Sequence, residues 1–306
     1  MLLESFLTPD FFNAILRATT PILLTALGAT VAQRSGITNM AVEGIMLFGA
    51  LFGVIFSAFT GGFLGGLLLT MVAGGVIGFL LAYFVIKLKT DEILAAIAIN
   101  MLATGGTVLL LLAVSGDRGS STSIISYSAP RINIPVIEQI PFIGQIISGQ
   151  NLMTYLAILA VVVMHIFLYK TPLGLQIRAV GENKNAAESV GISSRKIQYI
   201  ALIISGVLAA MGGFFLSGGY MNMFTKDMQA GKGYIALSAS AMGGSTPIGS
   251  MAVSFLFGIA QALANVMQLT EIPHELIQMI PYLTTIAGLA IFSYSAKKKK
   301  EKMTGK

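Results

Sequence analysis

Four polar side chains lie inside long apolar stretches of this sequence, where any solute chemistry would take place. Asn39 and Glu43 lie in GITNMAVEGIMLFGA, Asn100 in AIAINMLATGG, and Asn265 in IAQALANVMQ. Polar groups are costly to bury in a membrane, so each is a candidate for lining a solute pathway. Amides also bond neighbouring helices, and the Glu43 carboxylate is suited to accept hydrogen bonds from unpaired amides of an interrupted helix. Both interpretations stay open for these residues.

The sequence contains no residue pattern that is typical of an enzyme. It contains no cysteine and two histidines, His165 and His274, which the expected topology places on opposite membrane faces. Asp91 and Glu92 are adjacent at the expected start of a helix, where carboxylates act as caps. No HExxH motif, Ser/His/Asp set or phosphate-cradling glycine loop is present. We therefore expect no metal, no catalytic residue and no cofactor bound by this chain.

Composition indicates the environment of the whole chain. Charged residues make up 10% of it and hydrophobic residues 55%, and the mean hydropathy is +0.82, whereas soluble domains are about 25% charged. The net charge of +6 would suit nucleic acid, but the cations lie in loops and in the tail, as membrane topology requires. The sequence therefore predicts an all-α, polytopic integral membrane protein in a lipid bilayer, with no nucleic-acid partner.

Hydropathy predicts eight to ten transmembrane helices, since a helical span needs about 20 apolar residues. We expect one membrane domain over 1–296, followed by a cationic tail over 297–306. Gly and polar residues interrupt the chain near 30–45 and around 245, so one of these segments is expected to be a half-helix or re-entrant. The first apolar segment should be retained, since it lacks the features of a cleaved leader. The predicted spans are 11–33, 40–59, 63–86, 92–115, 151–169, 197–217, 233–252, 253–269 and 277–296.

Lysine and arginine orient these spans. They gather in 170–196, in the tail and near residue 88, whereas the long segment 116–150 has only Arg118 and Arg131. Because cytoplasmic loops carry the excess of Lys and Arg, the first three regions and the C-terminus are predicted to be cytoplasmic. Many of the 34 glycines recur four residues apart, as in Gly49 with Gly53 and Gly74 with Gly78. This spacing predicts close helix packing in lipid.

The polar stretch GLQIRAVGENKNAAESVGISS at 174–194 separates two apolar spans. Asn183 or Asn185 is a suitable N-cap for a short helix and Gly191 a suitable terminator. Helical spacing places Ala186, Ala187 and Val190 on one small-residue face. Such a capped cytoplasmic helix suits the groove of a soluble partner, although an ordinary capped loop has the same pattern.

This stretch resembles the coupling loop of ABC importer permeases, the cytoplasmic segment that engages the ATPase. More specifically, the chain is similar to the branched-chain amino acid, ribose and nucleoside permease family. SGITNMAVEGIMLFGA at 35–50, LGLQIRAVGENKNAAESVGI at 173–192 and GKGYIALSASAMGGSTPIGS at 231–250 carry the resemblance. INMLATGGT at 99–107 and PHELIQMIPYLTTIAGL at 273–289 resemble most the shorter permease of simple sugar or nucleoside importers.

The resemblance implies a transport subunit that does no covalent chemistry. It implies an ABC ATPase that carries ATP and Mg, a second and different permease, and an extracellular or periplasmic substrate-binding lipoprotein. The implied location is the cell membrane, and the implied solute is a nucleoside, with ribose or another simple sugar as the alternative. An ion-coupled secondary transporter and a membrane enzyme are the competing classes. The implied ATPase-coupling residues are Gly181, Glu182, Asn183, Ala186, Ala187, Val190 and Gly191, and the candidate pathway residues are Asn39, Glu43, Asn100 and Asn265.

Overall fold

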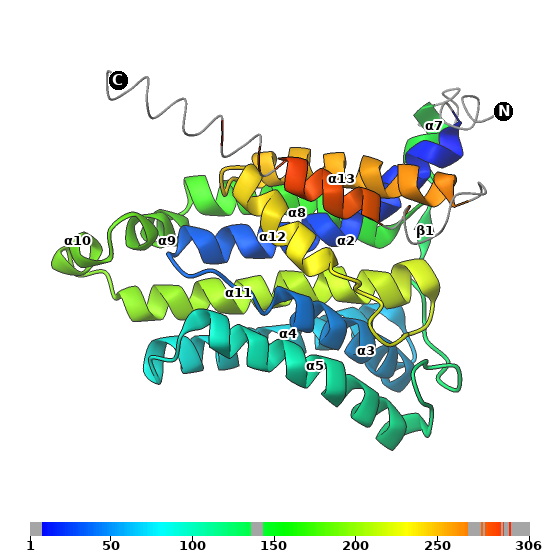
Figure 1. The fold of residues 1–306 in the computed structure, drawn as a ribbon, viewed down its shortest axis with the longest axis horizontal. Coiled ribbons are helices and arrows are strands. Elements are labelled where there is room, and N and C mark those ends of the chain that lie inside the picture. The colour runs from blue at the N-terminus through cyan, green and yellow to red at the C-terminus, as the bar shows by residue number, and fades with distance from the viewer. Residues whose placement is uncertain are drawn as a thin grey trace.

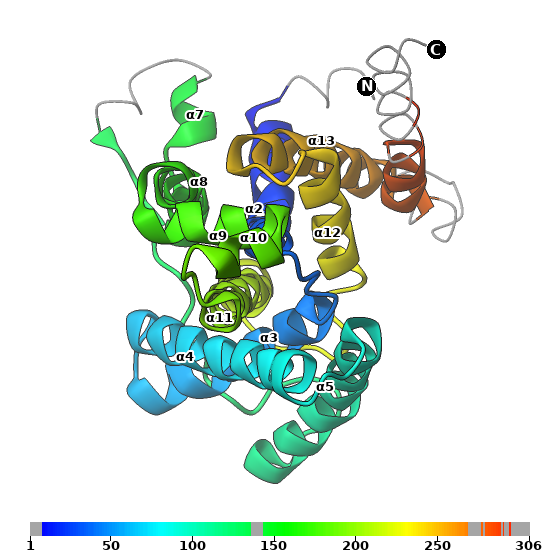
Figure 2. The ribbon, with the colours of Figure 1, turned by 90° about the vertical axis from the view of Figure 1, so that its left-hand side faces the viewer.

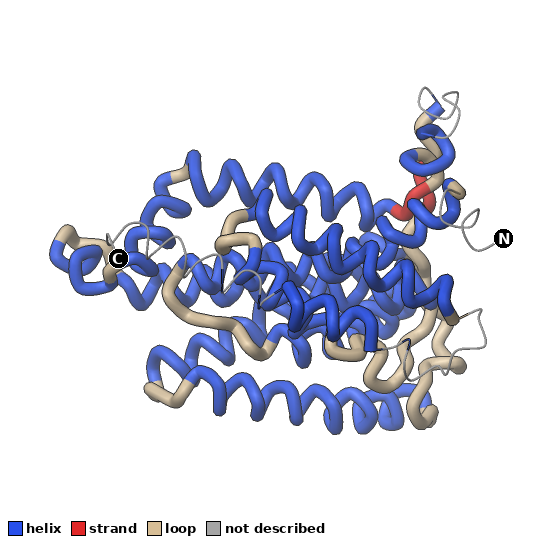
Figure 3. Tube along the Cα trace, turned by 45° about the horizontal axis from the view of Figure 1, so that its top comes forward, coloured by secondary structure: helices blue, strands red, loops and turns tan. Residues whose placement is uncertain are grey.

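The computed structural model describes residues 8–135, 143–268, 277, 279–288, 290 and 294. In this part of the chain, helices run mostly along the long axis of the molecule (Figure 1). A two-stranded antiparallel ribbon of β1 (Arg131–Ile132) and β2 (Gln150–Asn151) lies at the end opposite α10 (Figure 3). The helices are α2 (Pro9–Arg34), α3 (Val42–Thr60), α4 (Phe63–Ala82), η1 (Tyr83–Lys87), α5 (Glu92–Ser115), α7 (Ile143–Ile147), α8 (Leu152–Lys170), α9 (Pro172–Glu182), α10 (Lys184–Ser189), α11 (Ser194–Phe214), η2 (Phe215–Met221), α12 (Lys232–Met242) and α13 (Pro247–Met267).

Seven helices among the described residues are long and apolar enough to cross a membrane. Two of them continue into π-helical turns, α4 into η1 and α11 into η2. The first six predicted spans match α2, α3, α4 with η1, α5, α8 and α11 with η2 to within a few residues. The prediction of an all-α, polytopic membrane protein is therefore confirmed.

The predicted span over 233–252 is wrong. Helix α12 has only 11 residues, and α13 begins at Pro247, so the break lies at 243–246. This is the interruption expected around 245, whereas the predicted boundary between the spans 233–252 and 253–269 is wrong. Gly244 and Ser245 adopt positive φ angles of 64° and 51°, which ends α12, and the Thr246 hydroxyl caps α13 by accepting from the Gly249 amide. A half-helix was expected near 30–45 or around 245, and α12 at 232–242 is that half-helix. Of the predicted span 277–296, residues 279–288 are helical and most others lie outside the described residues.

Helix α11 lies at the centre of the bundle and packs against α2, α3 and α4 (Figure 2). Glycines allow these close approaches. A Cβ on Gly49 would lie 2.4 Å from the carbonyl oxygen of Ala210, and one on Gly74 would lie 2.3 Å from the Ala210 Cβ. A Cβ on Gly78 would lie 2.4 Å from another α11 carbonyl oxygen. The close packing predicted from the glycine spacing is therefore present, because α11 leaves no room for side chains there.

The chain between α2 and α3 is not helical. Residues 35–41 follow α2 without regular structure, and Gly36 has a φ of 84°. The second such segment, 222–231, joins η2 to α12, and Gly231 has a φ of 74°. Non-helical backbone is tolerated at membrane depth only where protein buries it or a cavity receives it. The candidate functional site forms where these two segments end and their helices begin.

Candidate functional site

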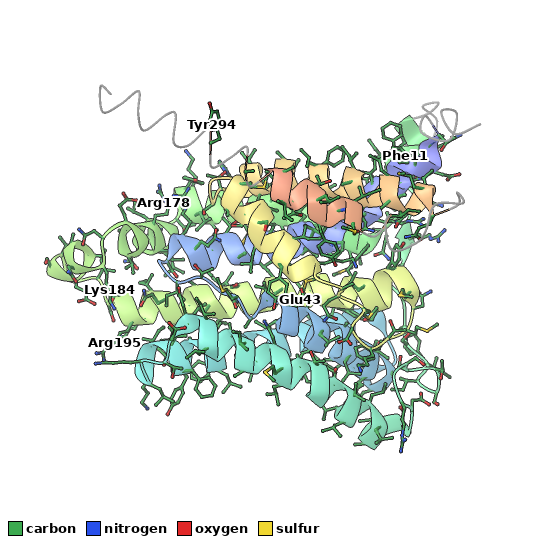
Figure 4. The ribbon with its side chains drawn as sticks, viewed as in Figure 1. Phe11, Glu43, Arg178, Lys184, Arg195 and Tyr294 are labelled. Atoms are coloured by element: carbon green, nitrogen blue, oxygen red, sulfur yellow. The ribbon has the colours of Figure 1, made fainter. Side chains whose placement is uncertain are left out.

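The starts of α3 and α12 meet at Glu43, which lies near the middle of the molecule (Figure 4). The Glu43 Oε1 accepts a hydrogen bond from the Gly231 amide at 2.8 Å, and its Oε2 accepts one from the Gly233 amide at 2.7 Å. A Cβ on Gly233 would lie 2.6 Å from the Glu43 Oε2. The close approach of the two helices therefore requires glycine at position 233.

The carboxylate replaces a cap that α12 lacks. The first amides of a helix have no partner within that helix, and Gly231 at the N-cap of α12 has no side chain to supply one. Glu43 also stands in the first turn of α3, so its negative charge faces the positive ends of two helix dipoles. The hydrogen bonding to an interrupted helix that the sequence suggested for Glu43 is what the structure shows.

Asn100 and Asn39 also form hydrogen bonds at this junction, the place where the starts of α3 and α12 meet. The Asn100 Oδ1 accepts from the Gly44 amide at 2.8 Å, and its Nδ2 donates to the Met40 carbonyl and to the Tyr234 Oη, both at 3.1 Å. Fully buried Asn39 accepts from a nearby amide through its Oδ1. Its Nδ2 donates to the Ser205 Oγ of α11 at 2.9 Å. Three of the four predicted polar residues thus converge on the backbone where α3 begins.

The depth of this junction follows from the helices that contact it. Asn100 is the ninth residue of α5, and Ser205 is the twelfth residue of α11. Both helices start at the same end of the molecule, where Lys89 and Arg195 line one pocket. At about 1.5 Å per residue the junction lies roughly 12 to 17 Å from that end, about half of a ~30 Å hydrocarbon core. The two helix starts therefore meet near the membrane midplane.

The structure does not bring Asn265 to this junction. Asn265 lies on α13, where its Oδ1 accepts from the Gln261 Nε2 at 3.2 Å. Both amides line a cavity of about 470 Å³, together with Arg17 of α2 and Lys232 at the start of α12. The cavity on the Glu43 side of the junction measures about 220 Å³. Two separate cavities therefore flank the beginning of α12.

The stretch 170–196 forms a protrusion at the end of the molecule opposite β1 (Figure 1). Helix α9 begins after Thr171, and Asn183 caps α10 because its side chain accepts from the Ala186 amide at 3.0 Å. The cap predicted for Asn183 or Asn185 is therefore formed by Asn183. Gly191 follows α10 with a φ of 85°, a conformation that suits glycine. The protrusion is thus two short helices.

The seven candidate coupling residues do not share one exposed face. Ala187 is buried at 4% exposure and belongs to the apolar core, because it points about 100° around α10 from Ala186. Gly181 packs against its own chain, since a Cβ there would lie 2.1 Å from the Arg34 carbonyl oxygen. Val190 is 75% exposed. Gly181, Glu182, Asn183, Ala186 and Gly191 are also exposed.

Arg34 is a site residue that the sequence analysis did not identify. Its Nε donates to the Ser245 carbonyl at 2.6 Å and its Nη2 to the Gly244 carbonyl at 2.9 Å. Arg34 therefore ties the end of α2 to the turn between α12 and α13, while Gly181 of α9 packs on its backbone. A lone arginine at the end of an apolar helix was the only signal for it in the sequence.

Comparison with known proteins identifies the family of the chain. The chain belongs to the family described as branched-chain amino acid transport system / permease component, which it matches over residues 11–289. It is 35% identical to the guanosine ABC transporter permease protein NupQ of Bacillus subtilis (strain 168), over 89% of this chain and 88% of the relative. It is 34% identical to the nucleoside ABC transporter permease protein NupC of Lactococcus lactis subsp. cremoris (strain MG1363), over 89% of both chains.

A further relative is the putative glucose ABC transporter permease protein TsgC13 of Haloferax volcanii, 30% identical over 91% of this chain and 90% of the relative. No solved structure matches the chain. The prediction of an ABC importer permease is confirmed, and the chain is a multi-pass protein of the cell membrane and a transport subunit. Permeases of this class work with an ATPase and a substrate-binding protein.

Proposed function

We propose that this chain is one of two permease subunits of an ATP-driven importer whose solute is a nucleoside. The observation that carries the proposal is its similarity to two nucleoside permeases, at 34% and 35% identity over 89% of its length. The junction near the membrane midplane supports a neutral solute. The Glu43 charge there is already engaged by two α12 amides, and Asn39 and Asn100 are uncharged.

The coupling to an ATPase is proposed for the protrusion of α9 and α10. Val190 is an aliphatic side chain at 75% exposure, at the tip of an otherwise polar segment, and Ala186 beside it is small and exposed. An apolar side chain held out on a capped helix suits a groove in a soluble protein. In this proposal Ala186, Val190 and Gly191 contact the ATPase, with Glu182 and Asn183 at the edge of the contact. Ala187 supports the protrusion from within, and Gly181 packs on the backbone of Arg34.

The remaining partners are proposed from the same class of transporter. A second, different permease completes the pathway, and a substrate-binding lipoprotein delivers the solute from outside. ATP and Mg bind the ATPase and not this chain. The cationic end of the molecule, with Arg178, Lys184 and Arg195 (Figure 4), faces the cytoplasm in this arrangement, as cation-rich loops do. The cationic tail at 297–306, which lies outside the described residues, would then be cytoplasmic too.

A simple sugar is the second candidate solute, because the 30% identical relative from Haloferax volcanii is named a putative glucose permease. Hydroxyl-rich sugars and nucleosides are both neutral and polar, so amides such as Asn39, Asn100 and Asn265 suit either. The two solutes are separated by direct uptake measurements with the reconstituted importer. Nucleoside uptake that needs ATP supports the proposal, and uptake of glucose or ribose without nucleoside uptake overturns it.

A further inference from the structure

The cavity of about 470 Å³ extends from one end of the molecule to the start of α12. Its lining begins at Asp10, the second residue of α2, and reaches Pro21 of the same helix. At about 1.5 Å per residue this is roughly 16 Å of helix, about half of a ~30 Å hydrocarbon core. Phe11 lies at this end of α2, opposite Lys184 (Figure 4). In the proposed arrangement the cavity therefore runs from the outer side towards the midplane.

Positive charge dominates the lining. Arg17 of α2 is exposed, Lys232 at the start of α12 is partly exposed, and both line the cavity. The Lys232 Nζ donates to the Gln229 carbonyl at 3.3 Å, and Glu43 attracts Lys232 only from beyond ion-pair distance. Asp10, at the outer end, is the one carboxylate among the described residues of the lining. Because cations at membrane depth face water or an opposite charge, we expect this cavity to be filled with water.

Two amides of α13 add one acceptor and one donor to the cavity. The Gln261 Nε2 donates to the Asn265 Oδ1 at 3.2 Å. This leaves the Gln261 Oε1 and the Asn265 Nδ2 without a partner in the described part of the chain, and neither atom is fully buried. Both side chains are partly exposed and line the cavity. These two groups are therefore accessible to a solute in it.

Beyond the start of α12, towards the cationic end, the helices around the cavity pack closely. The Thr30 Oγ1 of α2 lies 2.8 Å from the Ser240 Oγ of α12 and 2.8 Å from the Ser250 Oγ of α13, and all three residues are fully buried. A solute that enters from the outer end therefore meets packed helices. The apolar residues of this packing are Ile22, Ala26, Ile235, Ala236, Ala239 and Phe257.

We propose that this cavity is an outer subsite in which the solute is held before α12 moves to let it pass, an inference that rests on the proposed function. Arg17, Lys232 and the Asn265 Nδ2 donate to the carbonyl oxygens, ring nitrogens and ribose hydroxyls of a nucleoside. The Gln261 Oε1 accepts from an N–H or O–H of the same solute. The excess of positive charge disfavours cationic solutes.

The first test uses the absence of cysteine from this chain. Intact cells express the complete importer with Gln261→Cys or Ala18→Cys, two lining positions, and receive sulfonatoethyl methanethiosulfonate, an anionic thiol reagent that does not cross membranes. Both cysteines should be modified from outside. Leu256→Cys is the matched control, because Leu256 is 47% exposed about 140° around α13 from Gln261 and is not part of the lining. Absence of modification at both lining positions would overturn the water-filled cavity.

Occupancy by solute is tested in Ala18→Cys, which retains every polar group of the lining. Guanosine at about two to ten times its KM should slow the modification by about 3 to 10-fold. Modification that guanosine, ribose and glucose all leave unchanged would overturn the subsite. Protection by ribose or glucose with none by guanosine would instead support the subsite and overturn the nucleoside as the solute.

The positive charge is tested separately. The anionic reagent and the cationic trimethylammonioethyl methanethiosulfonate react with the same thiol, so the ratio of their rates reports the local potential. In Ala18→Cys, addition of Arg17→Gln should lower the anionic-to-cationic ratio about 3 to 10-fold. Arg118→Gln, at an exposed position outside the lining, should leave the ratio unchanged. An unchanged ratio in Arg17→Gln would overturn the role of positive charge in the subsite.

Discussion

Glu43 joins two helix starts through one carboxylate. Its oxygens accept from the amides of Gly231 and Gly233 at 2.8 and 2.7 Å, and its own residue lies in the first turn of α3. Neither amide has a partner within α12, so loss of the carboxylate leaves both without an acceptor from the protein. The residue thus positions the starts of α3 and α12 relative to each other.

Replacement of Glu43 should therefore lower stability before it changes solute preference. In Glu43→Ala both amides lose their acceptor, and each buried unpaired donor costs about 1 to 3 kcal/mol. Glu43→Gln keeps one acceptor oxygen, so its loss should be smaller. The thermal unfolding temperature of the purified chain in detergent should fall in the order wild type, Glu43→Gln, Glu43→Ala. Glu43→Ala with wild-type stability and abolished transport would instead make Glu43 a solute-contacting residue.

Gly233 should tolerate no side chain. A Cβ there would lie 2.6 Å from the Glu43 Oε2 and 2.7 Å from its Cα, so Gly233→Ala must separate α3 from α12. We expect a large fall in thermal stability. Gly105→Ala is the matched control, because no atom lies within 4 Å of a Cβ at this helical position, and alanine stabilises a helix by about 0.5 to 1 kcal/mol relative to glycine. Equal stabilities of the two variants would contradict the close approach of α3 and α12 at Gly233.

The sequence predicted part of this site. An ionisable residue and amides within apolar stretches identified Glu43, Asn39 and Asn100, because such groups need partners in a membrane. Spacing along the chain could not show that Asn265 faces a different cavity. Nor could it show that Tyr234, the third residue of α12, accepts a hydrogen bond from the Asn100 Nδ2.

At the scale of elements, Arg34 connects the protrusion to the half-helix. It bonds the carbonyls of Gly244 and Ser245 after α12, and Gly181 at the end of α9 packs on its backbone. We therefore expect a shift of α9 to displace the α12–α13 turn, and the opposite end of α12 contacts Glu43. This gives a continuous physical path from the proposed ATPase contact to the midplane junction.

Arg34→Ala should weaken the link between ATP hydrolysis and transport. The two carbonyls lose charge-assisted hydrogen bonds, which contribute about 1.5 to 3 kcal/mol each, and the turn then no longer follows α9. The expected result is continued ATP hydrolysis by the reconstituted importer with fewer solute molecules moved per ATP. Arg34→Lys retains the charge but not the planar guanidinium group. Its ratio of solute to ATP should therefore lie between those of the wild type and Arg34→Ala. An unchanged ratio of solute to ATP in Arg34→Ala would contradict this path.

The sequence predicted long elements better than short ones. Apolar stretches of about 20 residues matched six helices closely, since the bilayer thickness sets their length. It indicated an interruption around 245 but still continued one span to residue 252, because residues 233–252 are apolar enough for a span. The decisive feature was the turn at 243–246 with its positive φ angles, and glycine alone does not show which backbone conformation it adopts.

The molecule as a whole is asymmetric along its long axis. The α9 and α10 protrusion with Lys184, together with Arg195, lies at one end and Phe11 at the other (Figure 4). The Glu43 junction lies between them. In the proposed arrangement an ATPase at the charged end would act across about half the membrane thickness, through Arg34 and α12.

Docking should depend on the exposed residues of the protrusion. Ala186→Trp adds bulk and Val190→Asp adds charge at exposed positions with ordinary backbone conformation, so both should prevent co-purification of the ATPase without loss of the folded permease. They are better tests than Gly191→Trp, which should also abolish uptake but strains a φ of 85°. Ile125→Asp, at an 80% exposed position in a distant loop, should leave the ATPase bound. Retention of the ATPase by both protrusion variants would refute the docking surface.

The most direct measurement of the central claim is solute uptake by proteoliposomes that contain this chain, its second permease, the ATPase and the binding protein. Labelled guanosine should accumulate only when ATP is present with the ATPase, and Val190→Asp should abolish the accumulation. Guanosine uptake without ATP, or ATP-driven uptake of glucose or ribose with none of guanosine, would contradict the account.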